Sequence, residues 1–153
     1  MSGLPWFSQL KRELLDFADK NTYKDYFKPL ISGGKMLLDK DIREPLFDFL
    51  EERYGKVRIL EEKTVGNSRA DVVMVIPDKI VGIEIKSDAD TYARLARQVK
   101  DYNKFFDYNY VVVGSSHSKH IEEHVPEYWG IIEAISKEES VEFNVLREPE
   151  INK

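Results

Sequence analysis

Asp71, Glu84 and Lys86 are the residues of this chain whose types and spacing could do chemistry together. Asp71 precedes the apolar run 72–76, and Glu84 and Lys86 end the next apolar run, 80–86. Two β-branched runs around a short turn predict a β-hairpin, which would bring Asp71 opposite residues 84 to 86. Directly opposed residues have Cβ atoms roughly 5 Å apart. Two carboxylates this close need a cation, and oxygen ligands with open positions suit Mg²⁺ or Mn²⁺.

Alternation along the second strand places Gly82, Glu84 and Lys86 on one face of the sheet. The alternative to a metal site is a solvent-exposed hairpin face with an ordinary Glu–Lys pair. Nearly every other position of both strands is apolar, so we expect the sheet to be covered on both faces. A charged residue in such a sheet needs a functional reason, which favours the metal site.

Asp71 followed by Glu84-Ile85-Lys86 resembles the PD-(D/E)XK nuclease superfamily, which holds restriction enzymes, Holliday-junction resolvases and RecB-type nucleases. Ala70 stands where the superfamily's name has Pro, a departure that touches no metal ligand. Gln98 and Tyr102, on the helix expected after the hairpin, match the Gln-x-x-x-Tyr of RecB-like members. The Asp71, Glu84 and Lys86 motif therefore lies on a predicted hairpin followed by a predicted helix, as it does in the superfamily.

The resemblance implies a metal-dependent phosphodiesterase that cleaves nucleic acid, with DNA favoured over RNA and endonuclease over exonuclease activity. Asp71, Glu84 and the Ile85 carbonyl would hold Mg²⁺ or Mn²⁺, which polarises the scissile phosphate and acidifies a bound water. Lys86 would orient that water and offset charge developing on phosphorus. Gln98 would hydrogen-bond the water or a phosphate oxygen, although an ordinary polar residue at a helix–sheet boundary is the alternative.

An acidic residue on the first helix joins the metal shell in many superfamily members, and Glu44 is the matching position here. Glu44 fits a capping box begun by Asp41 equally well. Basic residues on the second helix form either a rim for phosphates or a solvated face. The residues expected to contact substrate are Arg69, Ser87, Arg94, Arg97 and Tyr102.

The resemblance also implies an α/β fold with a restriction-endonuclease-like three-layer core, in the order α-β-β-β-α-β, around a mixed central sheet. Apolar periodicity predicts helices at 41–54 and 90–106. The strand after the second helix should run parallel to the Glu84 strand through a right-handed crossover. The strands are expected at 57–62, 72–76, 80–86, 108–113, 129–135 and 141–146.

A Gly33-Gly34 pair separates an N-terminal helical extension, residues 1–35, from the nuclease-like domain, residues 36–153. Residues 8–20 predict an extra amphipathic helix in this extension. We favour its packing on the core or on a second subunit, as in a homodimer, over base stacking by the aromatic residues that follow it.

His120 and His124 offer a competing zinc site, because residues 120–124 match the His-x-x-Glu-His of inverted zinc peptidases. Two histidines four apart on a helix can share a zinc ion. Pro126, however, ends any helix almost at once, and a third ligand would have to come from elsewhere. We therefore favour surface histidines.

Composition agrees with one modest globular enzyme domain of 153 residues, 42% hydrophobic and 33% charged. There is no cysteine, no apolar run long enough for a membrane span and no signal pattern, so we expect a soluble, cytoplasmic protein without a membrane partner. A net charge of −5 argues against a general nucleic-acid coating protein. It allows a nuclease, and it leaves open a non-catalytic nucleic-acid-binding or assembly module that retains the nuclease fold.

Overall fold

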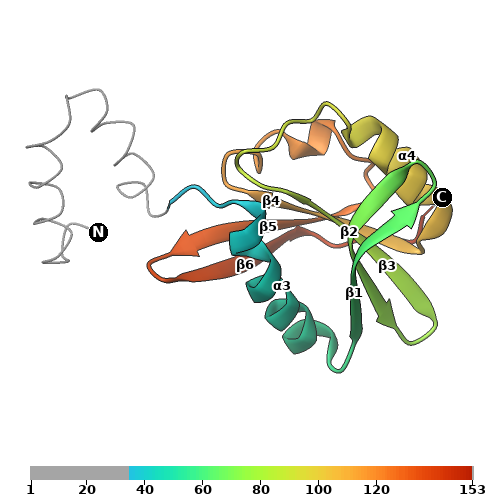
Figure 1. The fold of residues 1–153 in the computed structure, drawn as a ribbon, viewed down its shortest axis with the longest axis horizontal. Coiled ribbons are helices and arrows are strands. Elements are labelled where there is room, and N and C mark those ends of the chain that lie inside the picture. The colour runs from blue at the N-terminus through green and yellow to red at the C-terminus, as the bar shows by residue number, and fades with distance from the viewer. Residues whose placement is uncertain (1–34, 153) are drawn as a thin grey trace, which may run out of the picture.

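The structure is a computed structural model that describes residues 35–152. In this part of the chain, six strands form one sheet in the order β1-β2-β3-β4-β5-β6, with a helix packed on each face (Figure 1). The helices are α3 (Asp39–Tyr54) and α4 (Leu95–Phe105), and a 3₁₀ turn, η1, spans Ile121–Glu123. The strands are β1 (Arg58–Val65), β2 (Ser68–Ile76), β3 (Lys79–Lys86), β4 (Tyr108–Gly114), β5 (Gly130–Lys137) and β6 (Ser140–Arg147).

Strand directions make the sheet mixed. Strands β1, β2 and β3 pair antiparallel, β3, β4 and β5 pair parallel, and β6 returns antiparallel to β5. The predicted three-layer α/β core, with its α-β-β-β-α-β order and mixed sheet, is confirmed. The helix expected at 8–20 and the Gly33-Gly34 boundary lie outside the described residues. Within residues 35–152, no helix is long and apolar enough to cross a bilayer.

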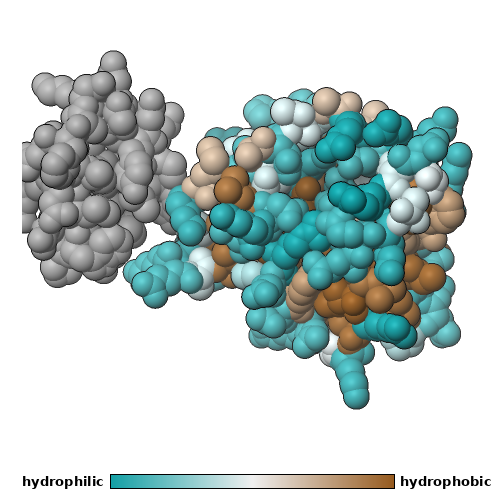
Figure 2. All heavy atoms as spheres, in the orientation of Figure 1, coloured by the Kyte–Doolittle hydropathy of each residue, from teal (hydrophilic) through white to brown (hydrophobic). Residues whose placement is uncertain are grey.

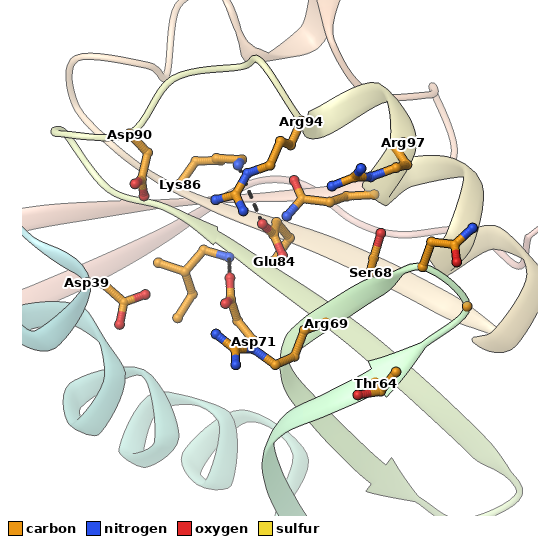
Figure 3. Close-up of a pocket in the computed structure, with 14 residues that line it drawn as sticks. Asp39, Thr64, Ser68, Arg69, Asp71, Glu84, Lys86, Asp90, Arg94 and Arg97 are labelled. Atoms are coloured by element: carbon orange, nitrogen blue, oxygen red, sulfur yellow. Dashed lines mark hydrogen bonds and ion pairs between the residues drawn. The ribbon is translucent and has the colours of Figure 1, made fainter.

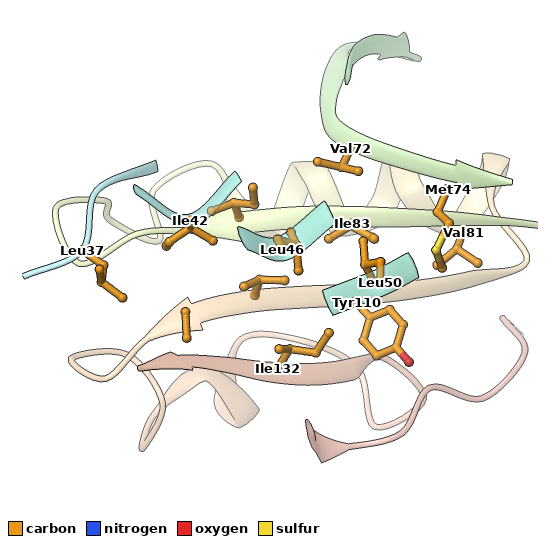
Figure 4. Packing of buried hydrophobic residues seen from close by; sticks show 13 residues of the cluster. Leu37, Ile42, Leu46, Leu50, Val72, Met74, Val81, Ile83, Tyr110 and Ile132 are labelled. Atoms are coloured by element: carbon orange, nitrogen blue, oxygen red, sulfur yellow. The ribbon is translucent and has the colours of Figure 1, made fainter. Parts of the chain in front are cut away.

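Strand alternation divides the apolar side chains into two cores, one on each face of the sheet. The α3 core contains Ile83 and Ile85 of β3, and partly buried residues such as Ile59 pack against it. Figure 4 shows Ile83 facing Leu46 and Leu50 of α3 in this core. Figure 2 shows hydrophobic atoms at the surface over β1 and the β2–β3 hairpin. The α4 core contains Tyr102 and Phe106. Both faces are thus covered, as the apolar runs predicted, and Glu84 and Lys86 lie buried on the α4 side.

Alternation breaks at Asp71 in β2. Ala70 packs in the α4 core, whereas Val72 packs in the α3 core, although residues two apart in a regular strand share a face. The opposite residue in β1, Glu62, has a φ of 56°. The Asp71 N–H donates to the Tyr102 hydroxyl, and the Asp71 carbonyl accepts from Arg43. Side chains thus satisfy both backbone groups of Asp71, at a point where the β1–β2 pairing is interrupted without a change of register.

Helix α3 begins two residues before the predicted boundary. Leu38 is its N-cap residue, and its backbone N–H donates to the Asp41 carboxylate at 2.9 Å. The predicted capping box centred on Asp41 and Glu44 is therefore wrong, because Asp41 is the residue that reaches back. The helix ends at Tyr54 as predicted, and Gly55 is its C-cap residue with a φ of 79°.

Two other boundaries differ from the prediction. The strands expected at 57–62 and 72–76 extend toward each other, so that only a tight turn separates β1 and β2, with Gly66 at a φ of 62°. Helix α4 begins at Leu95 rather than near residue 90. Residues between β3 and α4 instead form a turn in which Asp90 accepts from the backbone N–H and hydroxyl of Ser87.

Candidate active site

Most of the predicted site residues line one pocket, where β2 begins, β3 ends and α4 starts (Figure 3). The cavity has a volume of about 480 Å³. The hairpin brings both carboxylates and the lysine to its floor, and α4 with the preceding loop brings arginines to its rim. The predicted residues in its wall are Arg69, Asp71, Glu84, Ile85, Lys86, Arg94, Arg97 and Gln98.

Asp71 is held on both sides of its carboxylate. Its Oδ2 accepts the Ile85 backbone N–H at 2.8 Å, and its Oδ1 lies 3.4 Å from an Arg43 nitrogen. Burial raises the pKa of Asp71, while the Ile85 N–H and the Arg43 charge act in the opposite direction. The carboxyl group is thus largely removed from solvent, with 19% of the Asp71 side chain exposed, and its orientation is fixed by these two contacts.

Glu84 is the most strongly perturbed acid of the pocket. Its Oε1 accepts the Tyr102 hydroxyl at 2.6 Å, and its Oε2 lies 3.5 Å from the Lys86 ammonium. Burial, followed by the nearby Asp71 charge, raises the pKa of Glu84 to about 8. A buried carboxyl group whose ionisation is disfavoured by a neighbouring carboxylate is typical of a site that receives a cation or a proton.

Tyr102 lies behind the two carboxyl groups. Its side chain is fully buried, and its hydroxyl donates to Glu84 and accepts from the Asp71 N–H at 3.2 Å. The expectation that Tyr102 contacts substrate is therefore wrong, because no solvent-facing part of it remains. Tyr102 instead fixes the positions of both acids.

Gln98 and Lys86 complete the buried polar set. The Gln98 side chain lines the pocket, and its Oε1 is buried without a hydrogen-bond partner. A buried amide oxygen without a partner costs free energy unless a ligand supplies a donor. Lys86 has 5% of its side chain exposed, beside Glu84. These two residues therefore retain capacity for a ligand in the pocket.

The rim of the pocket is basic and exposed. Arg94 and Arg97 are exposed at the start of α4. Arg69 has 69% of its side chain exposed and pairs with Glu62 at 2.8 Å. Exposed ion pairs contribute about 0 to 1 kcal/mol, so Arg69 can exchange this partner for a phosphate at little cost.

Besides Tyr102, two predicted site residues are absent from the pocket wall. Glu44 is exposed and is absent from the pocket wall, so its assignment as a metal ligand is wrong for this arrangement. Ser87 is buried, and both its N–H and its hydroxyl are used by Asp90, which removes it as a substrate contact.

The sequence did not identify three charged residues near the carboxylates. Asp39 and Asp90 line the pocket, and Arg43 contacts Asp71. Asp39 and Arg43 are four apart and therefore share a helix face, a signal that becomes visible only once the start of α3 is known. Asp90 follows a strand end, where ligand sites are common in α/β sheets, and this signal was available.

The two histidines of the zinc alternative flank η1 and do not share an α-helical face. His120 precedes this 3₁₀ turn and His124 follows it. With three residues per turn, positions i and i+4 point in different directions. The His124 ring stacks on Tyr92, with ring centroids 3.9 Å apart. The helix required by the zinc-peptidase pattern is therefore missing.

The donor set of the pocket fits a hard divalent cation. Asp71, Glu84 and the Ile85 carbonyl supply oxygen donors, and the unpartnered Gln98 oxygen lies in the same wall. In the described range, no third His, Cys, Asp or Glu side chain joins Asp71 and Glu84 in a group that could hold a metal ion. A cation would therefore need water or substrate oxygens to complete its shell, which suits Mg²⁺ and Mn²⁺ better than zinc.

We expect Mn²⁺ affinity to fall as the pH drops below 8, because the raised pKa of Glu84, about 8, makes the cation compete with a proton. One competing proton predicts a Kd that rises about tenfold per pH unit between pH 8 and pH 6. Calorimetric titration at constant ionic strength measures this slope. Glu127→Gln, at an exposed site, should keep it. A Kd independent of pH would contradict the role of Glu84.

The raised pKa of Glu84 also affects the stability of the metal-free protein. A carboxyl group whose pKa is raised on folding stabilises the native state below its unfolded pKa, and this stabilisation is lost as the pH rises through the folded value. The metal-free protein should therefore lose stability between about pH 4.5 and pH 8, with Mn²⁺ restoring more of it at the upper end.

Comparisons with known proteins give one family and one structural likeness. A family model described as Bacteriophage P4 protein cII matches residues 34–153. No curated protein matches the sequence. A structure of SfsA from Pyrococcus furiosus in complex with Ca²⁺ is similar, with a TM-score of 0.42 and 15% sequence identity. The match covers 69% of this chain and 59% of that chain, so this chain spans less than two thirds of the SfsA chain's length.

Proposed function

The chain belongs to the bacteriophage P4 protein cII family, and we propose that it is a divalent-metal-dependent phosphodiesterase that cleaves nucleic acid, with DNA favoured over RNA. One observation carries the proposal. Two carboxyl groups, Asp71 and Glu84, meet a buried lysine at the floor of a pocket with an arginine rim, and the Asp71 charge adds to burial in raising the pKa of Glu84. This combination supplies a cation site beside an anion-binding surface.

Each residue of the pocket floor would have a separate role in hydrolysis. A cation held by Asp71, Glu84 and the Ile85 carbonyl would polarise the scissile phosphate and lower the pKa of a water molecule. Lys86 would orient the attacking water and offset the negative charge that develops as the new oxygen–phosphorus bond forms and the leaving oxygen departs. Gln98 would accept a hydrogen bond from the water through its unpartnered oxygen.

The arginines at the rim of the pocket would bind the substrate. Arg69, Arg94 and Arg97 would contact phosphates on either side of the scissile one, because exposed guanidinium groups can pair with phosphate oxygens bidentately. An endonuclease is favoured, and a cytoplasmic location agrees with a nucleic-acid substrate. The overall charge of −5 makes binding depend on this local rim.

The test is incubation of purified protein with labelled single-stranded, duplex and branched DNA and with RNA, each in Mg²⁺, Mn²⁺ or EDTA. Cleavage of at least one DNA substrate that requires the metal supports the proposal. Binding without cleavage of any substrate would favour a non-catalytic nucleic-acid-binding module. Arg94→Ala combined with Arg97→Ala should raise KM for the cleaved substrate more than it lowers kcat, because both groups bind phosphates that do not react.

A further inference from the structure

Arg43 extends from α3 into a ring of carboxylates beside Asp71. Its Nε lies 2.5 Å from Asp39, one Nη lies 2.6 Å from Glu62, and the other Nη lies 3.3 Å from Glu61. The side chain is 17% exposed. Four carboxylates, including Asp71 at 3.4 Å, thus surround this guanidinium group. Such a concentration of negative charge needs a cation at its centre.

Arg43 also donates a hydrogen bond to the backbone of Asp71. One Nη donates to the Asp71 carbonyl at 3.2 Å, and the other contacts the Oδ1 of the same residue. Asp71 is the position where β2 departs from regular alternation, and it has no paired residue in β1 or β3. One guanidinium group therefore fixes both the backbone and the carboxylate of a candidate metal ligand.

The position of Arg43 determines how many cations Asp71 can share. The Oδ2 of Asp71 faces the Ile85 N–H and the Glu84 side of the pocket, whereas its Oδ1 faces Arg43. A second cation bridged by Asp71 would have to sit at Oδ1 and take further oxygens from Asp39 or Glu62. The Arg43 nitrogens already lie in contact with those oxygens.

We propose that the Arg43 guanidinium replaces a second divalent cation beside Asp71, so that the site binds a single metal ion. Arg43 is then a positioning residue for Asp71. This inference rests on the proposed metal-dependent function, because it concerns the number of ions in that same site. The physical reason is charge: a fixed cation already balances the carboxylates on the far side of Asp71, and like charges would repel a second ion there.

The test is the number of Mn²⁺ ions bound at saturation, measured by calorimetry and by the electron paramagnetic resonance of free Mn²⁺. Wild type should bind one ion, and Asp71→Ala should bind none. Arg43→Ala should bind two ions, because the carboxylates keep their charge and lose their cation. Arg43→Lys should return the number to one, since it restores the charge. If the role of Arg43 were only structural, Arg43→Ala would not raise the number of bound ions to two, and Arg43→Lys would not bring that number back to one.

The outcomes separate this inference from the proposed function. Wild type binding two Mn²⁺ ions would overturn the inference and leave the metal-dependent function standing. One ion in both wild type and folded Arg43→Ala would overturn it as well. No ion in wild type would instead contradict the proposed function. If Arg43→Ala does not fold without metal, the wild-type and Arg43→Lys counts still decide, because both must equal one.

Discussion

Replacement of Asp71 by Asn or of Glu84 by Gln should reduce cleavage at least about a thousandfold, a loss of roughly 4 kcal/mol of transition-state stabilisation. Each change keeps the size of the side chain and removes one charged oxygen donor from the proposed cation site. The measurement is single-turnover cleavage of DNA in Mg²⁺. The same variants should lose the rise in melting temperature that Mn²⁺ causes in wild type, since an ion that binds only the native state stabilises it.

Matched controls distinguish this effect from a general loss of charge. Asp78→Asn changes the turn at the far end of the hairpin, and Glu127→Gln changes an exposed residue. Both should cleave at the wild-type rate and keep the metal-induced shift. Wild-type metal binding in both Asp71→Asn and Glu84→Gln would show that the cation site lies elsewhere.

Replacement of Lys86 by Ala should abolish cleavage and leave metal binding intact or tighter. The Lys86 ammonium lies 3.5 Å from Glu84, so its removal takes a positive charge away from the proposed cation site. The reaction would lose the group that orients water and offsets developing charge. Cleavage rate and Mn²⁺ affinity, measured on the same preparation, separate these two roles.

Lys137→Ala, an exposed residue at the end of β5, is the matched control and should leave both quantities unchanged. Loss of metal binding in Lys86→Ala would assign Lys86 to a structural ion pair with Glu84. Partial unfolding must first be excluded by thermal melting, because a buried carboxyl group without its partner is costly.

Local sequence patterns were sufficient to predict the hairpin and its charged residues. The apolar runs of β2 and β3 surround a short turn, and strand alternation alone puts Glu84 and Lys86 on one face. Tyr102 was predicted to lie on the second helix and to contact substrate. The structure places it in the α4 core with its hydroxyl on Glu84, so Tyr102 supports a site carboxylate and does not contact substrate.

The contribution of α3 could not be predicted in the same way. Glu44 was chosen by its position relative to a family pattern, but packing of Ile42 and Leu46 on the sheet decides which helix face meets β2. Successive helix residues point about 100° apart, so Arg43 reaches Asp71 while Glu44 faces solvent. The break in alternation at Asp71 could not be predicted either, because the side chains that satisfy its backbone come from α3 and α4.

The most direct test of the account is the cleavage of one labelled DNA by wild type, by Asp71→Asn and by the double variant His120→Ala/His124→Ala, with Mn²⁺ or EDTA. We predict that wild type and the histidine variant cleave in Mn²⁺ at rates within about tenfold of each other, that Asp71→Asn is inactive, and that EDTA stops all cleavage. Cleavage by Asp71→Asn, cleavage in EDTA, or loss of activity with the two histidines would contradict the account.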